Sequence, residues 1–141
     1  MAPYLEVRWE DGRDFVARGM TGPVTMLNLL RFRPQADYGA APHLPPQPIT
    51  GAEAYDRYIV HSAPFLKASG GEILFMGEGG PWLIGPGAER WDRIMLVRQR
   101  SVDAFLAHAE NAAYLAGVGH RTAAIADSRL LPIMETGLPQ H

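Results

Sequence analysis

The residues best suited to acid–base chemistry lie in one short segment, where two tyrosines precede a histidine. In a helix Tyr58 and His61 are three positions apart and share a face, as Tyr55 and Tyr58 do. A neutral imidazole can act as a general base, and a nearby phenol can orient it or bind an oxygen of the substrate. The alternative is an amphipathic helix that buries its aromatic rings and leaves His61 at the rim. For the tyrosines packing is the favoured role, and His61 is the first candidate for a catalytic base.

An amide interrupts the apolar segment VTMLNLLRF, in which Asn28 and Arg31 stand among strand-forming residues. A buried, unpaired amide costs about 1–3 kcal/mol, so Asn28 must have hydrogen-bond partners. Asn28 either points into a cleft and polarises a ligand oxygen beside His61, or it ties a bulge or a neighbouring loop across a dimer. Side chains alternate along a strand, so Asn28 and Arg31 fall on opposite faces unless a bulge intervenes.

Further candidates for substrate binding lie in the second half of the chain. His120 and Arg121 follow a Gly-Val-Gly segment, which leaves room for close packing or for a ligand. Arg121 could bind a carboxylate, or pair with Asp127 or Glu110 in a structural salt bridge. Trp91 opens a strand and either walls a cleft or fills a dimer interface.

The composition excludes several functional classes. The chain has 141 residues, 47% of them hydrophobic and 20% charged, which is typical of one soluble domain. It has no cysteine, and its formal net charge of -2 does not favour nucleic acid or an anionic membrane as a partner. No HxxxH or HxH pair, phosphate-binding loop or G-x-S-x-G elbow is present. We therefore expect a cytoplasmic protein without a metal or another cofactor.

Periodicity, helix caps and breakers define the expected elements. Thr50-Gly51-Ala52-Glu53 is typical of a capping box, so a helix begins there, with Pro64 removing one of its backbone bonds. Glycines in the following strand predict a bulge or a bend near 77–81. The expected elements are helix 10–19, strand 23–32, a proline-rich loop 34–49, helix 50–68, strand 72–85, turn 85–89, strand 90–100, helix 101–109, helix 111–125 and strand 128–134.

The order of these elements predicts an α+β fold. Strand, helix, strand, strand, helix and strand is the ferredoxin-like βαββαβ pattern, a four-stranded antiparallel sheet with helices on one face. The domain spans 1–141, with its core at 23–133. Because the other face of such a sheet is left open, its apolar side chains predict a homodimer.

Four segments carry a resemblance to a known family: VTMLNLLRF, YDRYIVHSAPFL, WDRIMLVRQRSVDAFL and, as the most specific, HRTAAIADSRLLP. Together they resemble the small bacterial proteins of the DUF1330 type, within the dimeric α+β barrel superfamily, over about residues 23–133. The resemblance implies that dimeric fold, with a ligand cleft between the sheet and the helices or loops that border it. The superfamily includes cofactor-free monooxygenases, lactone isomerases, haem-degrading enzymes and non-enzymatic ligand binders, so the fold alone does not give the function.

Two main hypotheses follow. The first is a cofactor-free enzyme that performs proton transfer, isomerisation or oxygenation on a carbonyl, enol or lactone-like compound. His61 and Asn28 would be catalytic, and Arg31, Tyr58, Trp91, His120 and Arg121 would bind the substrate. The second is a non-catalytic dimeric module that binds an unidentified small molecule. A haem binder, with His61 or His120 as the axial ligand, is a third reading.

Overall fold

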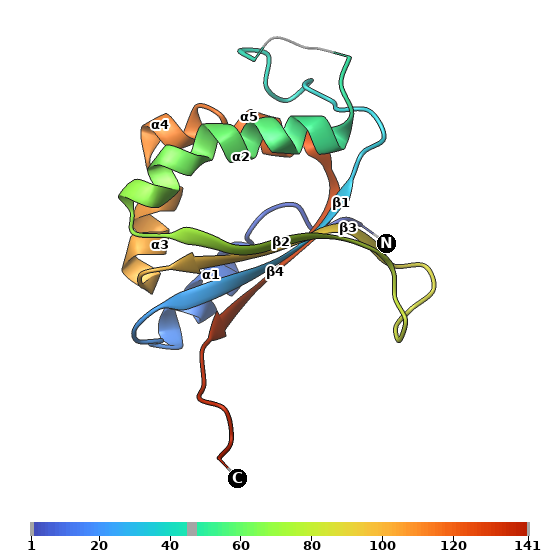
Figure 1. Cartoon of the computed structure of the whole chain (residues 1–141). Coiled ribbons are helices and arrows are strands. Elements are labelled where there is room, and N and C mark those ends of the chain that lie inside the picture. Colours follow the sequence, from blue (N-terminus) through green and yellow to red (C-terminus); the bar gives the residue numbers. More distant parts are fainter. Residues whose placement is uncertain (1, 45–47, 141) are drawn as a thin grey trace.

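A single antiparallel sheet carries the helices on one of its faces in the computed structural model, which describes residues 2–44 and 48–140 (Figure 1). The strand order β2-β3-β1-β4 confirms the predicted ferredoxin-like topology, here preceded by an additional helix. None of the helices in these residues is both long and apolar enough to cross a membrane. The elements are α1 (Trp9–Ala17), β1 (Val24–Phe32), α2 (Gly51–Ala68), β2 (Glu72–Pro81), β3 (Arg90–Gln99), α3 (Val102–Ala109), α4 (Ala112–Leu115), α5 (Val118–Ala124) and β4 (Ile125–Met134).

The longest helix, α2, begins at the predicted capping box. The Thr50 hydroxyl accepts the Glu53 N–H at 3.1 Å, and the Glu53 carboxylate accepts the Thr50 N–H at 3.0 Å. The helix continues through Pro64 to Ala68, so the proline does not end it. The local sequence signal therefore fixes where α2 starts, and this start forms one wall of the site described below.

Several predicted boundaries in the second half of the chain are wrong. The helix expected over 111–125 is divided into α4 and α5, and β4 already begins at Ile125. The division falls at a Gly-containing segment, and glycine weakens a helix interior. Strand β2 ends at Pro81, whose missing N–H cannot extend the ladder. Its register shift lies between Ile73 and Phe75 rather than at the glycines.

The inner face of the sheet, which carries the helices, is set by alternate residues of β1. Leu30 is fully buried and belongs to the main core cluster with Ala54 of α2 and Ala124 of α5. Asn28 lies two residues earlier and therefore shares this inner face, where it is paired with Met95 of β3. Asn28 is half-buried there, under the helix layer rather than on the open side of the sheet.

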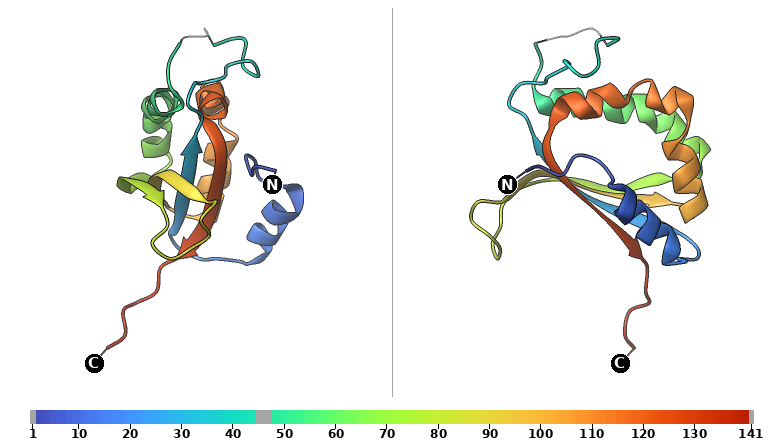
Figure 2. Two further views of the ribbon diagram at one scale, coloured as in Figure 1. Left: turned by 90° about the vertical axis from the view of Figure 1, so that its right-hand side faces the viewer. Right: turned by 180° about the vertical axis from the view of Figure 1, so that it is seen from behind.

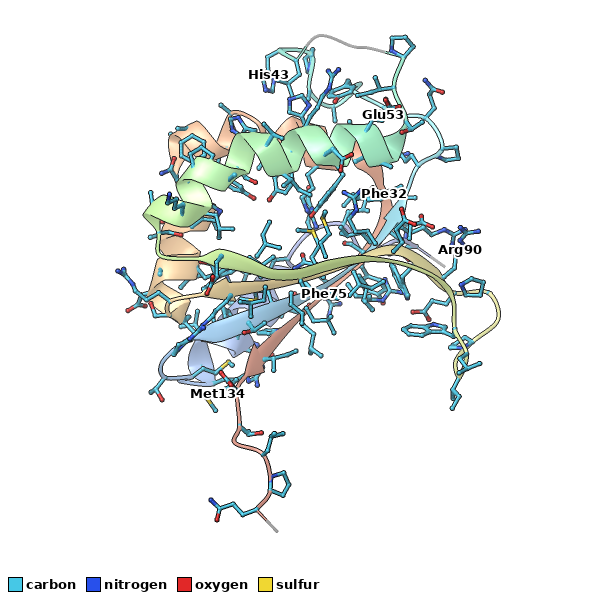
Figure 3. The ribbon with its side chains drawn as sticks, in the orientation of Figure 1. Phe32, His43, Glu53, Phe75, Arg90 and Met134 are labelled. Carbon is cyan, nitrogen blue, oxygen red and sulfur yellow. The ribbon has the colours of Figure 1, made fainter. Side chains whose placement is uncertain are left out.

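The outer face of the sheet is left uncovered by the helices of the described chain (Figure 1). Directly paired residues of an antiparallel sheet share a face, so the register gathers apolar side chains there. Phe75, labelled in Figure 3, and Leu131 are 53% and 55% exposed. The outer face comprises the apolar residues Leu27, Leu29, Phe75, Ile94, Leu96, Leu131 and Ile133.

The N-terminal segment and α1 lie beside the edge strand β4 (Figure 2). The Tyr4 N–H donates to Asp127 Oδ1 at 2.8 Å, and the Ser128 hydroxyl donates to the Tyr4 carbonyl at 2.6 Å. Phe15 of α1 contacts Phe105 of α3 edge to face, with ring centroids 5.9 Å apart. The segment thus covers part of an edge that would otherwise expose unpaired backbone groups.

The proline-rich loop packs over α5 rather than extending into solvent. The Asp37 N–H donates to the Ala123 carbonyl at 2.9 Å, and Tyr38 is buried in the core cluster. Positions 45–47 of this predicted loop lie outside the described residues. The first residues of the loop therefore lie against the helix layer.

The capping box gives a direct test of how firmly α2 is anchored. Replacing Thr50 with Ala removes the acceptor of the Glu53 N–H, and loss of such a cap costs about 1 kcal/mol. Denaturant unfolding at one fixed protein concentration should show this loss for Thr50→Ala. Thr21→Ala, at an exposed position before β1, should stay within about 0.5 kcal/mol of the wild type. Equal stability of both variants would mean that the cap does not anchor α2.

Candidate functional site

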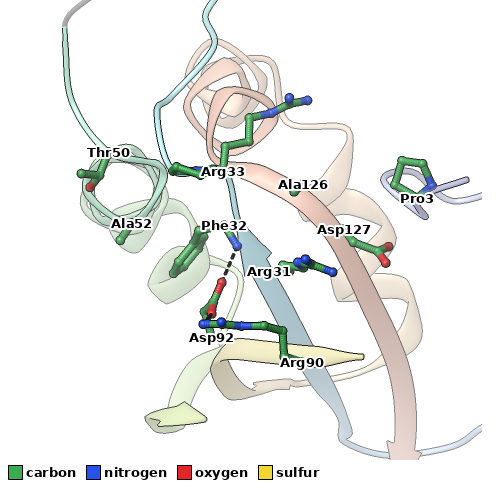
Figure 4. Close-up of a pocket in the computed structure, with 11 residues that line it drawn as sticks. Pro3, Arg31, Phe32, Arg33, Thr50, Ala52, Arg90, Asp92, Ala126 and Asp127 are labelled. Atoms are coloured by element: carbon green, nitrogen blue, oxygen red, sulfur yellow. Dashed lines mark hydrogen bonds and ion pairs between the residues drawn. The ribbon is translucent and has the colours of Figure 1, made fainter. Parts of the chain in front are cut away.

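A cavity of about 690 Å³ opens at the end of the sheet where β1 leads into the proline-rich loop and α2 begins (Figure 4). Its walls come from the N-terminal segment, the end of β1, the first turn of α2 and the starts of β3 and β4. We call it the arginine cavity after its charged residues. Its charged residues are Arg31, Arg33, Arg90, Asp92 and Asp127, and the others are Pro3, Phe32, Pro34, Thr50, Ala52 and Ala126.

The carboxylate of Asp92 is already engaged by the protein. Its Oδ1 accepts from the Arg90 guanidinium at 3.0 Å, and its Oδ2 accepts the Phe32 backbone N–H at 2.8 Å. The second bond joins the start of β3 to the end of β1 just beyond their last paired residues. Asp92 therefore has a structural role in shaping the cavity, and it neutralises Arg90.

Asp127 is also held by neighbouring groups. Its Oδ1 accepts the backbone N–H groups of Tyr4 and Ser128, and Arg129 pairs with it at 2.8 Å. Desolvation alone raises the pKa of Asp127, but the Tyr4 N–H, Arg129 and the Ser128 N–H together lower it below its ordinary value. Asp127 is thus a fixed negative charge at neutral pH.

Two guanidinium groups of the cavity have no such partner. Within residues 2–44 and 48–140, the Arg31 side chain makes no hydrogen bond and no ion pair. The Nε of Arg33 is buried and has no hydrogen-bond partner. A buried donor without a partner, such as the Arg33 Nε–H, is unusual in folded proteins, whereas the Arg31 side chain is exposed to solvent. The cavity therefore has an excess of positive charge that the described chain does not balance.

The backbone at Arg33 is fixed by three elements. Its N–H donates to the Ala124 carbonyl at the end of α5 at 2.8 Å, and its carbonyl accepts the Gly51 N–H at the start of α2 at 3.1 Å. A Cβ on residue 51 would collide with the carbonyl oxygens of both Arg33 and Ala124. Only glycine allows β1, α2 and α5 to meet this closely. The cavity wall is thus pre-organised, as a binding site requires.

Among the residues predicted to bind a substrate, Arg31 lines this cavity and Trp91 does not. Trp91 is buried, its indole N–H donates to Glu89 at 3.0 Å, and the Arg129 guanidinium lies 4.8 Å from its ring centroid. Such stacking of a cation on an aromatic face is attractive. Trp91 thus supports the wall behind the cavity by holding Arg129, the partner of Asp127.

The predicted tyrosines form a cluster between α2 and α4. The hydroxyl oxygens of Tyr58 and Tyr114 are 2.6 Å apart, and the ring centroids of Tyr55 and Tyr58 are 5.1 Å apart. Burial, reinforced by Tyr114, raises the pKa of Tyr58 well above its ordinary value.

Arg121 donates to the Leu5 carbonyl at 3.2 Å, so its predicted pairing with an acidic side chain is not made.

His61 lies against the turn that precedes α5. Its Nε2 is 3.0 Å from the Ala113 carbonyl and 3.1 Å from the Tyr114 carbonyl. Carbonyl oxygens only accept, so Nε2 carries the proton and donates to them. A Cβ on residue 117 would collide with the His61 ring, which explains the first of the two glycines before His120. His61 therefore ties α2 to the segment between α3 and α5.

His120 holds the proline-rich loop. Its Nδ1 is 2.8 Å from the Tyr38 hydroxyl. Burial, followed by the positive charge of Arg57 and by the neighbouring His61 and His43, lowers the pKa of His120 below its ordinary value. The Nδ1 of a neutral imidazole can accept a hydrogen bond from the Tyr38 hydroxyl, so the lowered pKa of His120 fits the observed contact.

Asn28 bonds to its own strand rather than to these side chains. Its Nδ2 donates to the Met26 carbonyl at 3.2 Å. The partner is a backbone carbonyl that belongs neither to a bulge nor to a neighbouring loop. Asn28 and Arg31 lie on opposite faces of β1, as the strand period predicted.

Sequence reasoning missed Arg33, Arg90 and the first turn of α2 as parts of a site. One signal was present, because Arg-Phe-Arg lies directly before the loop that leads to the capping box. Among the described residues, no group of three His, Cys, Asp or Glu side chains could hold a metal ion.

The contact between His61 and residue 117 gives a testable double-mutant cycle. Gly117→Ala should lower the free energy of unfolding by about 1–3 kcal/mol, because the added methyl group overlaps the imidazole. In a His61→Ala background the same change should cost less than about 0.5 kcal/mol, since the space is then free. Denaturant unfolding of the four proteins measures the coupling, and additive effects would contradict the proposed contact.

The fold was compared with known proteins. No family model and no curated protein matches the chain, so the resemblance to DUF1330 proteins stays a prediction. A solved structure described as a dimeric ferredoxin-like protein of unknown function from Thermobifida fusca is 13% identical, with 81% of this chain and 92% of that chain covered and a TM-score of 0.46.

A much stronger match exists to RPA0582, a protein of unknown function from Rhodopseudomonas palustris. Its crystal structure is 34% identical, with 97% of this chain and 100% of that chain covered and a TM-score of 0.86. The methylated form of RPA0582 is also 34% identical, with 99% and 100% covered and a TM-score of 0.87. Identity at this level along nearly the whole length of both chains shows that the present protein belongs to the same family as RPA0582.

Proposed function

We propose that this protein is a homodimer that binds a small molecule in the arginine cavity. The observation that carries the proposal is the cavity itself, whose volume of about 690 Å³ lies within the range usual for small-molecule sites. It combines apolar walls with a few converging polar groups, which is the common composition of such sites. Its position is fixed by the close junction of β1, α2 and α5 at Gly51.

The homodimer is supported by the outer face of the sheet. Seven apolar side chains lie on it, and Phe75 and Leu131 each leave more than half of their surface in water. Contiguous apolar surface of this kind is uncommon on monomers and marks an interface. A second copy that packs on the outer face would bury these side chains and would not obstruct the helix layer.

Catalysis by His61 and Asn28, in a cofactor-free enzyme, receives less support. The Nε2 of His61 is committed to two backbone carbonyls, which leaves only Nδ1 to accept a proton. Neither His61 nor Asn28 lines the arginine cavity. Proton transfer, isomerisation or oxygenation therefore stays a prediction from the sequence, and binding is the function that the geometry favours.

The homodimer can be tested with two exposed leucines. Leu131→Glu places a charge on the outer face, and we expect it to convert a dimer into a monomer because burying an unpaired charge is costly. Leu83→Glu is the matched control, since Leu83 is 100% exposed in the loop between β2 and β3. Light scattering after gel filtration gives the mass of each variant. A monomeric wild type, or a dimer lost only in Leu83→Glu, would contradict the proposed interface.

The ligand site can be tested by filling the cavity. Ala126→Phe should block the binding of small molecules, because Ala126 lines the cavity. A fragment library titrated against ¹⁵N-labelled protein should move the backbone amide signals of Phe32 and Ala52, and this response should disappear in the variant. Ala63→Phe fills a second hollow, between α2 and β2, and should leave the response unchanged. A library that moves no amide of the arginine cavity in the wild type would contradict the proposed function.

A further inference from the structure

We propose that the ligand of the arginine cavity is a small organic acid whose carboxylate Arg31 and Arg33 bind. This inference rests on the proposed small-molecule function and names the chemical class of its ligand. It follows from the charges that the protein leaves unbalanced, the helix end that lines the cavity, and the apolar surface beside them.

The charge balance of the cavity favours an anion. Arg90 is neutralised by Asp92, and Asp127 is held by Arg129 outside the cavity lining. Arg31 and Arg33 remain without a counter-ion in the described part of the chain. A carboxylate bound to them would supply the missing partner.

Arg33 adds to the preference for an anion because its Nε–H is buried without an acceptor. An unsatisfied buried donor costs free energy, and more so when the group is charged. A carboxylate matches the planar fork of a guanidinium and can accept two parallel hydrogen bonds from it. The cost of the orphaned donor is therefore removed when such a ligand binds.

The start of α2 adds to the positive potential. Thr50 and Ala52 line the cavity, and α2 is an 18-residue helix whose N-terminus lies at this wall. The aligned peptide dipoles place partial positive charge at the beginning of a helix and stabilise anions there. This contribution adds to that of the two arginines around the cavity, and the Glu53 carboxylate of the capping box offsets part of it.

The remaining surface of the cavity favours an organic ligand. Phe32, Pro34 and Ala126 offer apolar contacts that an inorganic ion cannot use. Asp92 and Asp127 are already paired with Arg90 and Arg129, so the charge left for a ligand comes from Arg31 and Arg33. A carboxylate on a small apolar body satisfies both features.

Benzoate and benzamide form a matched pair of probes, since they share the ring and differ mainly in the charge. Each is titrated into the ¹⁵N-labelled, full-length protein, and the backbone amides of Phe32, Ala52 and Ala126 report on the cavity. The amides of Leu66 and Ile73, at the second hollow, serve as the internal reference. Sodium phosphate is the third probe and separates an organic acid from a simple oxyanion.

We expect benzoate to move the cavity amides saturably, benzamide to bind at least tenfold more weakly, and phosphate to cause no saturable change. Arg31→Gln and Arg33→Gln should each weaken benzoate binding about tenfold, as the loss of one charge-assisted hydrogen bond implies. Arg18→Gln removes the same charge at an exposed position after α1 and should leave the affinity unchanged. Arg31 is exposed, so its variant tests the proposal even if Arg33→Gln does not fold.

Several outcomes would overturn the inference in different ways. Equal binding of benzamide and benzoate at the same amides would leave a small-molecule site that does not select anions. Saturable binding of phosphate without benzoate would reject the organic ligand. If none of the three probes moves these amides while neutral fragments do, the organic acid is rejected and the small-molecule function stands; if no compound moves them, both fail.

Discussion

The close approach of three backbone segments at Arg33 is the constraint on which the rest of the structure depends. The N–H of Arg33 donates to the last carbonyl of α5, and its carbonyl accepts the first N–H of α2. A Cβ on Gly51 would collide with the carbonyl oxygens of this junction. These bonds fix how the helix layer sits over the end of β1. They also satisfy backbone groups that would otherwise be buried without partners where a strand leaves the sheet.

The core cluster follows from this junction. Leu30 lies just before it on the inner face, and Ala54, Ala124 and Ile125 belong to the same core cluster, so this part of the core lies at the end of the sheet that carries the cavity. Small residues on α2 and α5 allow the helices to approach the sheet closely there. A rigid wall beside an open cavity is the arrangement in which a binding site keeps its geometry without a ligand.

Local sequence signals predicted the elements well but could not indicate which distant residues lie together, for one physical reason. The capping box at Thr50 and the alternation along β1 depend on near neighbours, and both are confirmed. The partners of His61 are backbone carbonyls more than fifty positions away, which no side-chain pattern can indicate. Arg121 likewise finds a carbonyl of the N-terminal segment instead of the acidic side chains nearer in sequence. The arginine cavity combines residues from five such segments, so only the folded topology brings them together.

The candidates differ in whether their polar groups have partners within the protein. Asn28 is a candidate because a buried amide is costly, and Tyr58 and His61 are candidates for acid–base chemistry, yet each has a partner within the protein. Their presence is therefore explained by the fold. Arg31 was a candidate from the sequence and Arg33 was not, and neither has a counter-ion in the described part of the chain. Arg31 is exposed to water, so the buried Nε–H of Arg33 is the donor whose cost the described chain leaves without compensation.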